Sequence, residues 1–170
     1  MQIAEDNVEF AVSSDDEEWR WVWHPPDHPP PGTMHGAAAV CFDADRVVLI
    51  SSDGQLWGLP GGRPEPGEGW VDTLRREVLE EACAVVTSHR LLGFCRAACV
   101  RGPQAGVVAR PGLVPGDCAP KLLGTPARDQ HRRLVTPQAV LGTIWIEDGL
   151  APMYGRVFAD AGLPVDEAAR

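Results

Sequence analysis

Three glutamates in the middle of the chain have the type and spacing of a metal-binding group. Glu77, Glu80 and Glu81 stand at positions i, i+3 and i+4, so a helix projects their carboxylates from one face. Clustered carboxylate oxygens suit Mg²⁺ or Mn²⁺, and a bound ion removes the repulsion among like charges. The alternative is a solvated acidic face, softened by an ion pair between Arg76 and Glu80 at i, i+4. The glutamates alone favour this second interpretation.

The residues upstream reverse that preference. A glycine pair, an acidic residue and an arginine precede the glutamates in the pattern Gly62-x5-Glu68-x7-Arg76-Glu77-Val78-x-Glu80-Glu81, after a lead-in of Leu59-Pro60-Gly61-Gly62. The order and every interval resemble the signature box of the Nudix hydrolases, which here covers Gly62–Ala84. So many fixed positions rarely coincide by chance, and the match therefore favours a metal site.

The end of the box departs from the family pattern. Cys83 stands where the family usually has Gly, and Ala84 stands where it prefers a larger aliphatic residue. A left-handed backbone conformation at this helix end would strain Cys83, because only Gly adopts it without cost. The departure concerns the end of the helix more than the expected metal ligands.

The resemblance implies hydrolysis of a nucleoside diphosphate linked to a further group, in an α/β fold built as an α/β/α sandwich with a mixed sheet. It makes Glu77, Glu80 and Glu81 the ligands of Mg²⁺ or Mn²⁺, and one of them can also serve as the base. It assigns Glu68 and Arg76 to holding the loop and the helix together through charge-assisted contacts. Gly61 and Gly62 would let the backbone approach the metal closely.

The substrate is a small nucleotide that the sequence does not specify. Trp57, just before the glycines, could stack on a base or could fill the core under the box, and the core is slightly favoured. Asp117 and Asp129 could each add a carboxylate from a downstream loop, but both are more typical of turn residues. The alternative function is a non-catalytic nucleotide- or protein-binding module that retains the box.

Periodicity predicts the elements that position these residues. A helix from about Gly69 to Ala82 carries an apolar side of Val71, Leu74, Val78 and Ala82. Apolar and β-branched runs predict strands at 37–42, 46–50, 85–86 and 91–100. Thr136 and Pro137 open a predicted helix through about Ile146, and a short helix follows over Pro152 to Ala161. Prolines and glycines break any long element in 101–130.

The first 35 residues resemble an arm that precedes the Nudix-like domain, predicted at 36–165, with a tail at 166–170. Alternation places Trp19, Trp21 and Trp23 on one face of a strand, before a proline-rich hinge. This stripe could stack on bases or form a dimer contact, which makes the arm compatible with a homodimer. Packing of the strand on its own core is the favoured explanation on general grounds.

Composition excludes several classes of function. The formal net charge of −9 argues against an extended nucleic-acid surface, because such surfaces need clustered Lys and Arg. No run of apolar residues is long enough for a membrane helix, and the acidic start lacks the apolar core of a secretory signal. The five cysteines include no CxxC pair, so neither a disulfide framework nor a zinc site is favoured. These features predict a reducing, cytoplasmic setting.

Overall fold

The computed structural model describes residues 1–14, 16–32, 34–113, 120–122 and 130–165. Asp117, Asp129 and the predicted tail at 166–170 lie outside the described residues. The strands form a six-stranded sheet and two smaller sheets. The six-stranded sheet contains, in spatial order, β1 (Glu9–Ser14), β2 (Glu17–His24), β8 (Phe94–Arg101), β9 (Val108–Leu113), β3 (Met34–Ala38) and β6 (Gly61–Gly62).

The smaller sheets have three and two strands. One contains β11 (His131–Val135), β5 (Arg46–Ser51) and β4 (Cys41–Asp43), and the other pairs β10 (Pro120–Leu122) with β7 (Ala84–Val86). The pairing of β3 with β9 is parallel, and the other strand pairs are antiparallel. The predicted mixed character of the sheet is therefore confirmed.

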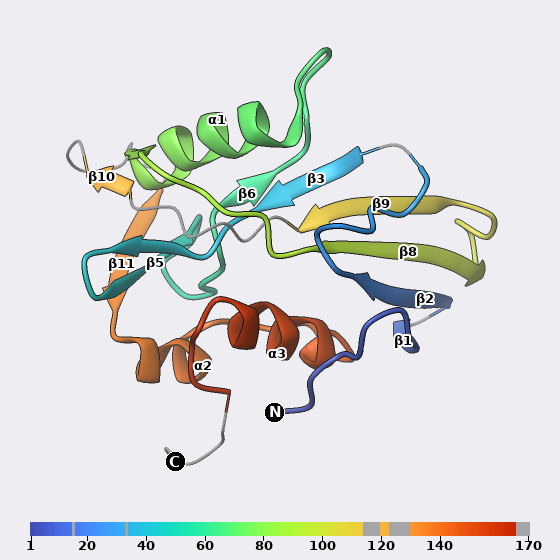
Figure 1. Ribbon diagram of the computed structural model, residues 1–170. Coiled ribbons are helices and arrows are strands. Elements are labelled where there is room, and N and C mark those ends of the chain that lie inside the picture. The colour runs from blue at the N-terminus through green and yellow to red at the C-terminus, as the bar shows by residue number, and fades with distance from the viewer. Residues whose placement is uncertain (15, 33, 114–119, 123–129, 166–170) are drawn as a thin grey trace.

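Helices cover both sides of the strand layer (Figure 1). Helix α1 (Trp70–Ala82) lies on one side, and α2 (Val140–Thr143) and α3 (Ala151–Asp160) lie on the other. This arrangement confirms the predicted α/β/α sandwich. Among the described residues, none of the helices has the length and apolar character needed to cross a lipid bilayer.

Strand β5 shows why the chain forms two apolar layers. Successive side chains on a strand point to opposite faces, and the fully buried Val47 and Leu49 pack in a cluster with residues of α3. Val48, between them, packs with Leu74 and Val78 of α1. The run of apolar residues in β5 thus reflects burial on both faces, and it ties α1 and α3 to one strand.

The tryptophan-rich strand β2 pairs with β1 on one edge and with β8 on the other. Trp23 is fully buried, and Trp19 and Trp21 pack partly buried against a cluster that includes Val12 and Met153. The stripe therefore packs on its own core, in agreement with the favoured explanation. The domain boundary at residue 35 stays a prediction. Strands β1 and β2, before this boundary, belong to the same sheet as β3, after it.

The helix predicted from Thr136 through Ile146 is shorter than expected. A 3₁₀ turn at Pro137–Ala139 leads into α2, which ends at Thr143, and Ile144 is extended (φ −72°, ψ 137°). Ile144 forms a parallel bridge with Trp57, and the backbone N–H of Trp145 donates to the carbonyl of Trp57 at 2.8 Å. The tertiary pairing overrides helical continuation where Gly142 and β-branched residues give low helix propensity.

The cysteines also differ from expectation. Cys83, Cys95 and Cys99 are free thiols, but Cys41 is disulfide-bonded. Burial raises the pKa of the Cys95 thiol far above its usual range, so this side chain packs as a small apolar group. The sequence did not favour a disulfide framework, and the single disulfide-bonded Cys41 was not anticipated, because count and spacing do not reveal which cysteines the fold brings together.

Cys83 ends α1 in the left-handed conformation (φ 48°, ψ 50°), and its N–H donates to the carbonyl of Val78. Replacing Cys83 with Gly is expected to stabilise the fold by about 1 kcal/mol, because a Cβ is unfavourable there. The melting temperature should rise by roughly 2–4 °C. The matched control is Cys83→Ala, which keeps the Cβ and should not raise it. An equal rise in both variants would assign the effect to the thiol instead.

Candidate functional site

Strand β6 brings the glycine pair between strand β3 and helix α1. Gly61 and Gly62 pair with Ala38 and Ala37 of β3. A Cβ at Gly61 would overlap the carbonyl oxygen of Ala37 and the Cα of Ala38, and a Cβ at Gly62 would overlap the Glu77 carboxylate. Backbone atoms therefore exclude a side chain at Gly61, and a side chain at Gly62 would require the Glu77 carboxylate to move. Their close neighbours in the structure are β3 and Glu77, and the expected approach to a metal stays a prediction.

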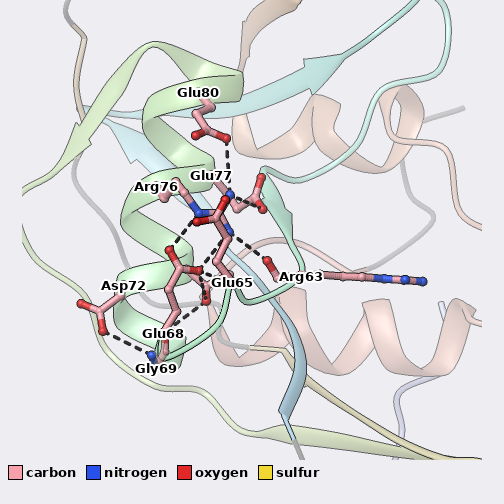
Figure 2. Close-up of polar contacts among 9 residues, drawn as sticks. Arg63, Glu65, Glu68, Gly69, Asp72, Arg76, Glu77 and Glu80 are labelled. Atoms are coloured by element: carbon pink, nitrogen blue, oxygen red, sulfur yellow. Dashed lines mark hydrogen bonds and ion pairs between the residues drawn. The ribbon is translucent and has the colours of Figure 1, made fainter.

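A network of charged residues joins the loop after β6 to helix α1 (Figure 2). Arg76 donates from Nε to Glu68 Oε1 at 2.9 Å and from Nη2 to Glu68 Oε2 at 3.0 Å. Its Nη2 also donates to the carbonyl of Arg63 at 2.8 Å. The paired contact with Glu68 is the bidentate geometry that makes arginine–carboxylate interactions strong. The structure thus shows Glu68 and Arg76 fastening the loop to the helix.

Glu68 also organises the start of the helix. Its Oε2 accepts hydrogen bonds from the backbone N–H of Glu65 at 2.8 Å and from the Thr73 hydroxyl at 3.1 Å. The Arg76 hydrogen bonds, followed by that of Glu65, lower the pKa of Glu68 from 4.5 to about 2. Each of these donors favours the ionised form. The loop is therefore held by an ionised carboxylate.

The low pKa of Glu68 predicts a pH-dependent contribution to stability. A carboxyl whose pKa is lower in the folded state stabilises the protein above its unfolded pKa. This contribution should be full above pH 4.5 and be lost as the pH falls toward 2. Glu68→Gln should therefore lower the melting temperature at pH 7, and its difference from the wild type should shrink between pH 4.5 and 2.

Thermal melts across this pH range measure the effect. Glu65→Gln removes the same charge from the same loop, where the backbone N–H of Glu65 contacts Glu68. This control should change the melting temperature little at either pH. A Glu68→Gln deficit that is constant down to pH 2 would contradict the assigned role of the ionised carboxylate.

The three glutamates lie along one side of α1 but differ in surroundings. The Glu77 side chain is 13% exposed and the Glu80 side chain is 59% exposed. Arg76 Nη1 donates to Glu77 Oε1 at 2.9 Å and to Glu80 Oε2 at 3.3 Å (Figure 2). Glu81 Oε2 accepts from the backbone N–H of Gly61 at 2.9 Å. The ion pair expected between Arg76 and Glu80 is therefore present.

The carboxylates do not gather into a single cluster. Within the described ranges, no three His, Cys, Asp or Glu side chains lie close enough together to hold a metal ion. The physical reason is that these carboxylates already have other partners. Arg76 donates a hydrogen bond to one oxygen of Glu77 and to one oxygen of Glu80, and the backbone N–H of Gly61 donates to one oxygen of Glu81. Sequence spacing places side chains on a face, but it does not show which partners they choose there.

The donor set nevertheless fits a hard divalent cation. The pKa of Glu81 is raised above its usual value. Burial is the largest cause, the hydrogen bond from Gly61 partly opposes it, and the charges of Glu77 and Glu80 raise the pKa further. The three carboxylates are thus close enough to repel one another, which a divalent cation would relieve. The missing Cβ at Gly62 leaves the space that the Glu77 carboxylate occupies. Oxygen-only donors of this kind suit Mg²⁺ or Mn²⁺.

Comparisons with known proteins identify the domain. Residues 32–106 match the family model described as the NUDIX domain. The chain contains a Nudix domain. The match includes β3 and β6, the Glu68–Arg76 network and all three glutamates. The motif resemblance seen in the sequence is thereby confirmed.

Two similar proteins place this Nudix domain among its relatives. A mouse (Mus musculus) protein, nucleoside diphosphate-linked moiety X motif 6, is 40% identical over 68 residues, covering 36% of this chain and 22% of the relative. The chain thus spans about a fifth of the length of that relative. The crystal structure of the Bacillus subtilis pyrophosphohydrolase BsRppH aligns with a TM-score of 0.58 and 19% identity, covering 85% of this chain and 82% of that one. The second likeness supports the fold.

Trp57, just before the Nudix box, belongs mainly to the core. It is 8% exposed, it packs in the cluster that includes Trp23 and Val157, and the Arg133 guanidinium lies 4.2 Å from its ring centroid. Trp57 also lines a cavity of about 210 Å³. The slight preference for a core role therefore agrees with its position, and its part in the cavity wall was not anticipated.

Two further residues of this cavity were not found from the sequence. Trp145 is 54% exposed, and Gln130 has a buried Oε1 atom without a hydrogen-bond partner. The sequence places Trp145 in a predicted helix, and no pattern distinguishes Gln130 from other polar residues. Trp145 could have been noticed as a tryptophan beside Gly142, where a helix is weak. Gln130 had no such signal.

Proposed function

We propose that the protein is a metal-dependent pyrophosphohydrolase that cleaves a diphosphate bond in a nucleoside diphosphate derivative. The observation that carries this proposal is the Glu68–Arg76 network of a Nudix domain, in which Arg76 also contacts Glu77 and Glu80, while Glu81 accepts a hydrogen bond from Gly61 of the glycine strand. The names of the two similar proteins, nucleoside diphosphate-linked moiety X motif 6 and the pyrophosphohydrolase BsRppH, support the same class of substrate and bond.

Each residue of the box has a role in this proposal. Glu77, Glu80 and Glu81 hold Mg²⁺ or Mn²⁺, which when bound neutralises charge on phosphate oxygens and lowers the pKa of water. One of these carboxylates accepts the proton of the attacking water. Arg76 and Glu68 are positioning residues that keep the helix in register with the loop. Gly61 and Gly62 leave space beside Glu77 that a larger residue would fill.

The charge of the whole chain is compatible with this substrate. An anionic nucleotide approaches a protein of net charge −9, and a divalent cation supplies the positive charge locally.

The cytoplasmic setting and the homodimer remain proposals. The free thiols of Cys83, Cys95 and Cys99 support a reducing compartment, whereas the disulfide at Cys41 weighs against one. The Trp-rich strand β2 gives the homodimer less support than its sequence suggests, because its tryptophans pack inward.

The experiment that tests the function is a panel of nucleotides. Nucleoside triphosphates, dinucleoside polyphosphates, nucleotide sugars and ADP-ribose are each incubated with the protein, with Mg²⁺, with Mn²⁺ or with a chelator. The expected result is release of phosphate, pyrophosphate or a nucleoside monophosphate from at least one class, only with metal. Absence of any product from a folded protein across the panel would refute the enzymatic assignment.

The second candidate function is a non-catalytic nucleotide- or protein-binding module. It is favoured by one observation, namely that Arg76 already pairs with Glu77 and Glu80, so the carboxylates do not form a metal cluster in the described structure. Tight binding of a nucleotide from the same panel, with no turnover under any metal condition, would select this alternative.

A further inference from the structure

We propose that Arg132 is a positioning residue for the metal site, and that its guanidinium holds the last turn of α1 so that Glu80 and Glu81 present their carboxylates to the divalent cation. The inference rests on the proposed function, because it concerns the cation that Glu77, Glu80 and Glu81 bind in that proposal. It goes further in assigning a role to a residue that lies outside the Nudix box and far from it in the sequence.

The last turn of α1 lacks the groups that usually stabilise a helix end. The peptide dipoles leave partial negative charge at the C-terminus of a helix, where basic side chains are favourable and acidic side chains are not. The last turn of α1 contains Glu80 and Glu81 and no basic residue. Cys83, which ends the helix, has the left-handed conformation that only glycine adopts without cost. Taken alone, α1 is therefore expected to fray at the turn that carries two of the three proposed ligands.

Arg132 supplies the missing positive charge from another part of the chain. It lies on β11, which runs past the C-terminal end of α1 (Figure 1). Its Nη1 donates to the carbonyl of Ala82 at 2.6 Å and, at a longer distance of 3.5 Å, to the carbonyl of Cys83. The last carbonyls of a helix have no partner within the helix, and a charged donor makes a stronger hydrogen bond than a neutral one. One side chain thus stabilises the end of α1 by both its charge and its hydrogen bonds.

The position of Arg132 on β11 is itself fixed by the core. Strand β11 pairs with β5, where Arg132 lies opposite Ile50. Leu134 is two residues further along β11 and therefore points to the same face. It packs against the cluster that contains Leu74 and Val78 of α1. The half-buried side chain of Arg132 thus reaches the helix end from a strand that the core holds against the same helix.

The last turn is held at two points. The backbone N–H of Gly61 donates to the Glu81 carboxylate at 2.9 Å, and Arg132 bonds to the carbonyl of the next residue, Ala82. Because a metal site depends on the relative placement of its ligands, a shift of this turn moves Glu80 and Glu81 relative to Glu77 on the preceding turn. Groups that orient metal ligands without touching the metal typically contribute roughly 10–100-fold to metal affinity.

Titration of the metal-free protein with Mn²⁺, without nucleotide, tests this inference. Free Mn²⁺ is measured by electron paramagnetic resonance, well below the melting temperature of each variant, so that only folded protein is compared. Arg132→Met, which keeps the apolar stem, should raise the Mn²⁺ dissociation constant about tenfold or more. Simple electrostatics predicts the opposite sign, because removal of a positive charge near a cation site favours the cation. Unchanged or tighter Mn²⁺ binding would therefore overturn the proposal.

Further variants assign the effect to the helix end. Arg132→Lys keeps a positively charged donor and should recover part of the lost affinity. Arg46→Gln removes the same charge from an exposed position on β5, in the same sheet as β11, and should change the affinity little. In a Cys83→Gly background the left-handed conformation carries no cost, so Arg132→Met should lower the affinity by a smaller factor. An equal loss in both backgrounds would contradict the assigned action through the helix end.

Hydrogen exchange of the metal-free protein gives a readout that involves no cation. The amides of residues 80–83 should exchange faster in Arg132→Met than in the wild type, because the last turn opens more often. The amides of residues 74–77, in the middle of α1, should keep wild-type protection. Equal protection of residues 80–83 in the two proteins would show that Arg132 does not hold this turn.

The outcome separates this inference from the proposed function. Mn²⁺ binding that depends on Arg132, without hydrolysis of any nucleotide in the panel, would keep the positioning role and refute the enzyme. Hydrolysis by a wild-type protein whose Mn²⁺ affinity ignores Arg132, or that binds no Mn²⁺ without nucleotide, would keep the enzyme and refute the positioning role.

Discussion

Glu80→Gln and Glu81→Gln are each expected to reduce metal-stimulated hydrolysis by at least about 10²-fold, the scale typical for loss of a group that moves a proton or holds the catalytic charge. Each substitution removes a charge and keeps the shape of the side chain. In the Glu81→Gln variant, the amide oxygen can still accept the Gly61 N–H hydrogen bond, which is 2.9 Å long in the wild type. The fold should therefore survive while the metal response is lost.

Turnover measured against Mg²⁺ concentration, together with thermal melts, checks this prediction. Glu65→Gln is the matched control, because it removes an acidic charge from the same box at an exposed position outside the helix. It should retain wild-type turnover. Full activity in both Glu80→Gln and Glu81→Gln would show that the site has been wrongly assigned.

Gly62→Ala and Gly61→Ala are expected to fail in different ways. An alanine Cβ at 62 overlaps the Glu77 carboxylate, the movable end of a side chain, whereas a Cβ at 61 overlaps backbone atoms of Ala37 and Ala38. Gly62→Ala should therefore displace Glu77 and lower turnover by roughly 10²-fold, the cost of misplacing a group at a reaction centre. Gly61→Ala should separate β6 from β3 and destabilise the fold by about 1–3 kcal/mol.

Melting temperature and turnover, measured on the same preparations, distinguish the two effects. Gly142→Ala in α2 serves as the control, because its Cβ meets no atom within 4 Å and alanine favours a helix. This variant should be as stable as the wild type or more so. A Gly62→Ala enzyme with wild-type turnover would mean that the position of Glu77 does not limit the reaction.

Periodicity and motif spacing predicted the parts of the structure that depend on local patterns. Helix α1 runs from Trp70 to Ala82, almost as expected, and Leu74, Val78 and Ala82 are fully buried. The contacts of Glu68 with Arg76 also follow the motif. These features are predictable because they are local. Glu68 and Arg76 are eight positions apart, and one helix and the loop that leads into it determine how they meet.

The remaining features depend on residues that are distant in the sequence. Helix α2 ends early because Ile144 and Trp145 pair with Trp57, which lies far upstream before the Nudix box. The cavity joins residues from β5, the following loop, α1 and the segments before β11 and after α2. Its unpaired Gln130 oxygen is recognisable only when those segments are assembled. No local pattern encodes such a combination.

Arg76 gives the helix its own internal counterion. Because this guanidinium contacts Glu68, Glu77 and Glu80 together, its one positive charge is shared among three of the acidic side chains of the box. Under the proposed function, a divalent cation that binds Glu77 and Glu80 would therefore replace the contacts that Arg76 makes with them. Under the proposed function, such a helix folds before any cation is present, and the cation is bound and released together with the nucleotide.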